Sequence, residues 1–146
     1  MSRRASYLLV PVSALLLAGC AAGTTMSSGA ALPSGGALED RWERRVVTLL
    51  VAERIADACY GQGITMAPSP YGGAVHRATE EMVAAGEDRA ALDAVFASHD
   101  FNGTTAAVEG YLASRGGSVE APQSLCPVGE AEIAEGSDVG RVLTRL

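Results

Sequence analysis

Apolar side chains recur at spacings of three and four along much of the chain after residue 37, a pattern that is typical of amphipathic helices. The clearest case is Leu38–Cys59, where polar residues fill the opposite side of the predicted helix. Its apolar face is formed by Trp42, Val46, Leu49 or Leu50, Val51, Ile55, and Ala58 or Cys59. Gly61 and Gly63 follow, and glycine commonly ends a helix in this way. We therefore expect a long first helix over Leu38–Cys59.

Shorter helices are expected in the rest of the chain. They are predicted over Ala74–Ala85 and from Glu87-Asp88 onward. After a break at Asp100–Gly103, Thr104 or Thr105 would cap the next helix, and a last helix over Val128–Leu143 would be broken or kinked near Gly136. Glycine and proline mark Gly61–Gly73 as a loop, and Ser118–Pro127 is irregular. Because no alternating apolar pattern of strand length appears, the predicted fold class is all-α, a small bundle of about four to five helices.

The first 37 residues have a different pattern. Arg3 and Arg4 precede an apolar run, Tyr7–Leu17, and then Leu17-Ala18-Gly19-Cys20. A charged start, an apolar run and small residues at a cleavage site are typical of a signal peptide. The four junction residues resemble the lipobox of bacterial lipoproteins, which implies that Cys20 is the lipidated N-terminus of the mature protein. The predicted organisation is a signal peptide over 1–19, a lipidated flexible tether over 20–37 and a helical domain over 38–146.

Other interpretations of the leader are an ordinary secreted protein with Cys20 at the cut, or a membrane-spanning helix. A spanning helix needs about 20 apolar residues, whereas this run is shorter and contains Pro11. Ala21 follows the lipobox, and in lipoproteins of two-membrane bacteria aspartate at that position resembles a signal for retention at the inner membrane. We therefore expect anchoring in the outer membrane, facing the periplasm.

Composition and charge narrow the function. The chain has 146 residues, with 11 basic against 17 acidic side chains and a formal net charge of −6. Nucleic-acid binding is disfavoured, since it needs a basic patch that displaces phosphate counterions. Aromatic residues make up only 5% of the chain, so the 48% hydrophobic content corresponds to a modest core rich in alanine.

Two cysteines remain if Cys20 carries lipid. Cys59 and Cys126 would lie in a compartment that oxidises thiols, so a Cys59–Cys126 disulfide is expected. Closing a loop of about 68 residues would stabilise the fold by roughly 4 kcal/mol in the chain-entropy model. Two free buried thiols, or a metal or redox pair, are the alternatives, and the Cys-x-x-Cys spacing of redox pairs is absent.

Candidate chemistry is sparse. Ser98-His99-Asp100 spells a catalytic triad, but adjacent side chains cannot converge on one atom. His76 and Glu80, four residues apart on a predicted helix, would more readily form an exposed ion pair than a metal site. Asp100–Gly103 resembles a calcium loop with its glycine misplaced, so a capped turn fits better. Asn102-Gly103-Thr104 fits a glycosylation sequon, which carries little weight in a bacterial protein.

Paired carboxylates for sugar cleavage are the remaining catalytic possibility. The candidates are Glu80, Glu81, Glu130, Glu132 and Glu135. Nothing in the sequence places two of them across a cleft, so they are interpreted as part of a solvated surface.

The last third of the chain carries a further motif. It consists of Tyr111-Leu112, Pro122-x-x-Leu125-Cys126, Gly129, Glu132-Ile133-Ala134, Ser137, Val139-Gly140 and Leu143. These residues resemble the C-terminal signature of a family of small exported bacterial proteins classed as a domain of unknown function. Cys59, Ile64 and Met66 are similar to the family's first cysteine segment. The break at Asp100–Gly103 and the lipobox depart from its pattern, and the resemblance implies no activity or catalytic residue.

The expected function is that of a cell-envelope lipoprotein that acts by binding, as an accessory or structural module with an envelope protein or the cell wall as partner. No cofactor is expected, and the chain is more readily a binding protein than an enzyme. A small cell-wall hydrolase is the alternative, and a periplasmic ligand or metal carrier a weaker one. A deep pocket with two carboxylates, or with Glu80 facing His76, would favour chemistry, and an exposed apolar patch would favour binding.

Overall fold

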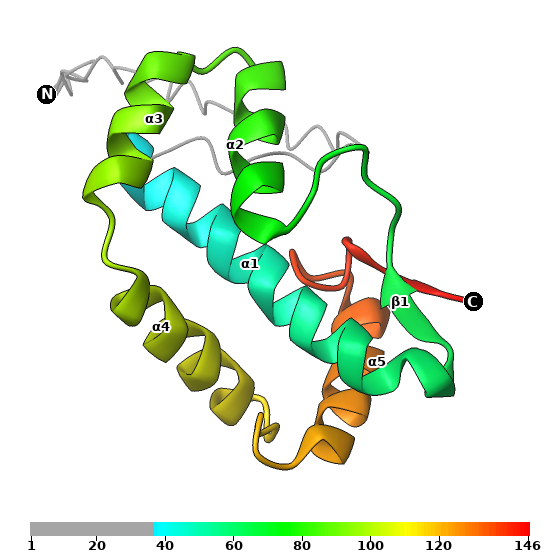
Figure 1. The fold of residues 1–146 in the computed structure, drawn as a ribbon. Coiled ribbons are helices and arrows are strands. Elements are labelled where there is room, and N and C mark those ends of the chain that lie inside the picture. Colours follow the sequence, from blue (N-terminus) through cyan, green and yellow to red (C-terminus); the bar gives the residue numbers. More distant parts are fainter. Residues whose placement is uncertain (1–36) are drawn as a thin grey trace, which may run out of the picture.

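The computed structural model describes residues 37–146, which form five α-helices and a two-stranded sheet (Figure 1). The helices are α1 Leu38–Cys59, α2 Ala74–Ala84, α3 Arg89–Ser98, α4 Phe101–Ser114 and α5 Leu125–Glu135. Two short 3₁₀ helices, η1 Tyr60–Gln62 and η2 Pro122–Ser124, and the strands β1 Ile64–Met66 and β2 Leu143–Arg145 complete the described fold. The predicted all-α class is confirmed, and α1 has the bounds that the apolar pattern predicted.

Helix α1 is the centre of the bundle. It packs against each of the other four helices and against β1, and Figure 1 shows α2 and α3 on one side of it and α4 and α5 on the other. The core residues of α1 are almost fully buried: Trp42, Val46, Leu49, Val51, Ala52, Ile55, Ala56 and Cys59. Burying apolar area gives about 25 cal/mol per Å², so this buried face contributes a large share of the hydrophobic stabilisation.

A disulfide between Cys59 and Cys126 joins the end of α1 to the first turn of α5, which confirms the predicted pairing. Both cysteines are buried, at 0% and 4% exposure. The bond closes a loop with a sequence separation of 67 residues. It therefore holds the α1–α5 contact in a core that has few large side chains.

Two features differ from the prediction. Strands β1 and β2 pair antiparallel, with Ile64 opposite Arg145 and Met66 opposite Leu143. Three-residue strands are too short to show an alternating pattern, so the sequence did not reveal them. The helix predicted over Val128–Leu143 is broken near Gly136 as expected, because Gly136 adopts φ +62° and α5 ends at Glu135. The part after the break is not helical, since the chain there turns into β2.

Helix α4 begins earlier than expected. The carboxylate of Asp100 accepts a hydrogen bond from the backbone N–H of Asn102 at 3.0 Å and caps α4, which starts at Phe101. The break is therefore limited to His99 and Asp100, and Thr104 lies buried inside the helix instead of capping it. Helix α5 likewise starts at Leu125, because a proline is tolerated in the first turn of a helix and Pro127 lies there.

No helix within residues 37–146 has the length and apolar character needed to cross a membrane. The predicted signal peptide, Cys20 and most of the predicted tether lie outside the described residues.

Candidate functional site

The residues of the apparent triad serve three separate structural roles. Ser98 Oγ donates a hydrogen bond to the carbonyl oxygen of Ala94 at 3.0 Å. His99 lies with Nε2 2.5 Å from Thr104 Oγ1 and makes an edge contact with the Trp42 ring. Asp100 caps α4, so the three groups do not converge on a common point. The capping role also accounts for the sequence that resembled a calcium loop.

The His76–Glu80 pair is an exposed ion pair, as expected. The His76 Nδ1 atom lies 3.8 Å from Glu80 Oε1, and the histidine side chain is 65% exposed. The Arg89 guanidinium, which donates to Glu80 Oε2 at 2.7 Å, lowers the pKa of that carboxyl. Within residues 37–146, no group of three or more histidine, cysteine, aspartate or glutamate side chains is placed to hold a metal ion.

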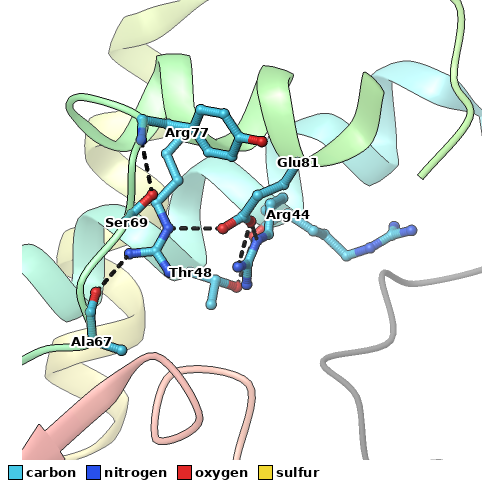
Figure 2. A network of polar contacts seen from close by, with 8 residues as sticks. Arg44, Thr48, Ala67, Ser69, Arg77 and Glu81 are labelled. Carbon is cyan, nitrogen blue, oxygen red and sulfur yellow. Dashed lines mark hydrogen bonds and ion pairs between the residues drawn. The ribbon is translucent and has the colours of Figure 1, made fainter. Parts of the chain in front are cut away.

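Most of the other candidate carboxylates are bound by arginines on neighbouring elements. Glu81 on α2 receives hydrogen bonds from Arg45 Nε at 2.7 Å and from Arg77 Nε at 2.8 Å. Arg77 Nη1 also donates to the Ala67 carbonyl at 3.4 Å, as Figure 2 shows. The network joins α1, α2 and the segment after β1. Glu130 and Glu135 pair with arginines in the same way, and these pairs hold elements together without enclosing a cleft.

Glu132 is the exception among these carboxylates, because it is fully buried. Its Oε1 atom accepts a hydrogen bond from the Tyr111 hydroxyl at 2.8 Å and pairs with Arg115 Nε at 2.8 Å, and Ser137 Oγ donates to its Oε2. Burial, together with the bond to Glu132, raises the pKa of Tyr111 to about 12. Interpreting Glu132 as a solvated residue was wrong: on α5 it shares a buried face with Leu125, and that helical spacing was the available signal.

Gly140 completes the cluster around Glu132. Its backbone N–H donates to Ser137 Oγ at 2.9 Å, and a Cβ on Gly140 would lie 1.9 Å from the carbonyl oxygen of Glu132. The segment after α5 therefore lies directly against that helix. Glu132, Ser137 and Gly140 are residues of the C-terminal motif, and their contacts are internal. The motif thus describes how the chain folds back on α5.

A different surface has the form of a binding site. It is an open groove between α1 and α4 that ends against the segment 119–125, with a volume of about 400 Å³. Its apolar lining is provided by Leu50, Ala58, Val108, Val119, Pro122 and Leu125, and its polar lining by Arg54, Asp57, Thr105 and Glu109. Pockets of about 300–1,000 Å³ with mostly apolar walls and a few polar groups are typical of small-molecule sites.

The charged residues at the groove have no close partner in the described part of the chain. Within residues 37–146, Arg54, Asp57 and Glu109 form neither an ion pair nor a hydrogen bond through their side chains, in contrast to Arg45 and Arg115. Arg54 and Asp57 act only at longer range on Glu53, whose pKa is raised by burial and lowered in part by a hydrogen bond from the Ala74 backbone. The groove thus presents a guanidinium and two carboxylates, unpaired among residues 37–146, beside an apolar wall.

The disulfide supports the inner end of the groove. Ala58 and Leu125 line the groove, and each directly precedes one of the bonded cysteines. The Cys126 sulfur lies 3.9 Å from the Ala58 carbonyl oxygen. Sequence reasoning missed the groove because it arises where α1 and α4 meet. The spacing of Leu50, Arg54, Asp57 and Ala58 along one side of α1 was the available signal.

A second apolar surface lies at the α3–α4 junction. The Phe96 and Phe101 side chains are 49% and 41% exposed, and both rings make edge contacts with buried Trp42. The Phe96 ring therefore lies at the surface of the Trp42 cluster. The two phenylalanine rings also pack against each other, with centroids 5.6 Å apart, so they cover part of their own apolar surface. The concave groove is therefore the better candidate site.

Together these features define a small, disulfide-linked α-helical protein with an open apolar groove. Residues 39–144 match a family described as "Family of unknown function (DUF5333)", and the chain belongs to this family. The resemblance to an uncharacterised family is therefore confirmed. No curated protein and no solved structure matches the chain.

Proposed function

We propose that this chain is a lipid-anchored protein of the bacterial cell envelope that acts by binding, and that the α1–α4 groove holds its ligand. The observation that carries the proposal is the groove itself, an apolar cavity of about 400 Å³ whose edge holds three charges that are unpaired among residues 37–146. Exposed apolar surface costs free energy in water, at about 25 cal/mol per Å². A preformed apolar groove therefore favours a ligand with an apolar part.

The location rests on the N-terminal sequence. Leu17–Cys20 has the lipobox pattern, and residues 21–37 are rich in glycine, serine, threonine and alanine, which is typical of a flexible linker. Several acyl chains on Cys20 would give firm anchoring, because each buried methylene contributes about 0.8 kcal/mol. With alanine at position 21, the proposed location is the outer membrane, with the helical domain in the periplasm.

Binding in the groove is tested with an acyl chain that carries an environment-sensitive fluorophore. Thr105 lines the groove and is exposed, so Thr105→Trp should fill the site and abolish the fluorescence increase. Ala106, exposed on the same helix but outside the groove, provides the matched control Ala106→Trp, which should bind like the original chain. If the original chain gives no signal, or both variants bind equally, the groove is not the binding site.

The anchor is tested separately by Cys20→Ser. This variant lacks the thiol that would be acylated, so it should leave the membrane fraction or accumulate unprocessed. Unchanged membrane fractionation would contradict the proposed lipoprotein.

A further inference from the structure

We propose that the ligand of the α1–α4 groove is a single-chain amphiphile with a zwitterionic headgroup, whose anionic group pairs with Arg54 and whose ammonium group pairs with Asp57 or Glu109. This inference rests on the proposed function and names the ligand class of the same site. It follows from two properties of the groove, its capacity and the charges at its edge.

The capacity fits one acyl chain. The groove is lined by Leu50, Val108, Val119 and Leu125 and has a volume of about 400 Å³. A methylene group takes up about as much space as a water molecule in the liquid, roughly 30 Å³, so the groove would hold a chain of roughly a dozen carbons. A two-chain lipid would leave much of its apolar surface outside.

The charges fit a headgroup of both signs. The Arg54 guanidinium presents a planar set of N–H donors, which matches the oxygens of a phosphate or carboxylate. Asp57 lies one turn further along α1, and Glu109 lies across the groove on α4. Since none of the three has an ion-pair partner within residues 37–146, a ligand meets no competing bond from that part of the chain.

Ligands that carry a charge of only one sign complement the charged residues at the edge of the groove less well. A fatty acid would pair with Arg54 and place its negative charge near two carboxylates. An alkylammonium would pair with the carboxylates and place its positive charge near Arg54. A single-chain phospholipid with an ethanolamine headgroup carries a phosphate and an ammonium group, so it can occupy both kinds of site at once.

Headgroup preference is measured by displacing the fluorescent acyl probe from the full-length chain, with ligands of equal chain length below their micellar concentrations. The three ligands are lysophosphatidylethanolamine, anionic lysophosphatidylglycerol and an alkyltrimethylammonium. We expect the zwitterionic lipid to displace the probe at the lowest concentration. This preference should shrink in 0.5 M salt (about a 4 Å Debye length), because exposed ion pairs are screened.

Two substitutions assign the headgroup contacts. Arg54→Gln should weaken the binding of both phospholipids about two- to fivefold, as expected for the loss of an exposed ion pair. It should not weaken the binding of the alkylammonium. The double variant Asp57→Asn and Glu109→Gln should weaken the binding of the ethanolamine lipid and of the alkylammonium, but not the binding of lysophosphatidylglycerol. The matched controls lie outside the groove: Arg89→Gln makes the same charge change as Arg54→Gln, and the double variant Glu39→Gln and Asp93→Asn makes the same charge change as the groove double variant.

The outcomes separate the two proposals. If Thr105→Trp blocks the probe but the three ligands displace it equally, or Arg54→Gln changes nothing, the groove binds apolar chains and the headgroup inference is wrong. If either control variant has the same effect as its groove counterpart, the preference reflects overall charge and the inference is also wrong. If the probe does not bind at all, the proposed function itself fails.

Discussion

The close approach of Gly140 to α5 can be tested by adding one methyl group. Gly140→Ala would place a Cβ 1.9 Å from the carbonyl oxygen of Glu132 and 2.4 Å from its carbonyl carbon. Those atoms belong to the helix backbone, so no side-chain rotation can move them away. Separating them to at least 3.0 Å requires residues 139–141 to move off α5.

The expected cost is about 3 kcal/mol or more. Overpacking a core by one methyl group that side chains can accommodate costs about 1–3 kcal/mol, and here the clash is with backbone. Displacing Gly140 also breaks its hydrogen bond to Ser137 Oγ, which supports the buried Glu132. For a domain of this size, such a loss lowers the melting temperature by more than about 12 °C.

Two other glycines calibrate the measurement. A Cβ on Gly129 would lie 2.5 Å from Ile55 Cγ2 and 3.2 Å from Ile64 Cδ1, and these side-chain atoms can adjust, so Gly129→Ala should cost about 1–3 kcal/mol. Gly110 lies within α4, where an added Cβ would meet no atom of another element within 4 Å, so Gly110→Ala should stabilise by about 0.5–1 kcal/mol.

The assay is urea unfolding monitored by circular dichroism. The midpoints are compared between variants whose free energy of unfolding has the same dependence on urea concentration, because a changed midpoint then reports a changed stability. The expected order of stability is Gly110→Ala, the original chain, Gly129→Ala and then Gly140→Ala. If Gly140→Ala is as stable as the original chain, the segment after α5 does not pack as the structure has it.

Three further results are expected. Reducing the Cys59–Cys126 bond should cost roughly 4 kcal/mol and weaken probe binding in the groove, because Ala58 and Leu125 lose their support; equal binding by the reduced, still folded chain would contradict this. The pKa of Tyr111 is about 12 in the fold against 10.0 ordinarily, so the raised pKa contributes fully to the free energy of unfolding below pH 10, and this contribution is lost as the pH rises towards 12. Tyr111→Phe should therefore flatten the dependence of the free energy of unfolding on pH between pH 10 and 12. The pKa of Glu53 is raised from 4.5, so it contributes to the free energy of unfolding below pH 4.5, and this contribution is lost as the pH rises through the pKa of Glu53 in the folded chain. Glu53→Gln should remove this pH dependence from the free energy of unfolding, measured by urea unfolding at a series of pH values.

Local sequence patterns predicted the helices well and the connections less well. The spacing of Trp42, Val46 and Ile55 was sufficient for α1, because one apolar face of a long helix is visible in the sequence. Asp100 illustrates the limit. It was assigned to a break, but its carboxylate caps α4, and a capping bond depends on a few degrees of backbone geometry.

The candidate site was predicted in part. Cys59 and Cys126 paired as cysteine counting indicated, because two thiols allow one intramolecular bond. Glu132 was assigned to the surface, although Tyr111, Arg115 and Ser137 satisfy its charge in the interior. Those partners lie up to 21 residues away in the chain, so their convergence cannot be read from local spacing.

The sequence by itself determined the all-α class, the extent of α1 and the cysteine pair, and it predicts an N-terminus of lipoprotein type. These properties depend on short-range periodicity, on counting or on a contiguous motif. The tertiary structure alone decided the β1–β2 pairing, the buried Glu132 cluster and the α1–α4 groove. Each of these arises where segments distant in the chain meet, so the free energy that selects it comes from packing between elements. Local spacing can show one of the faces that meet, but it does not show which segment packs against that face.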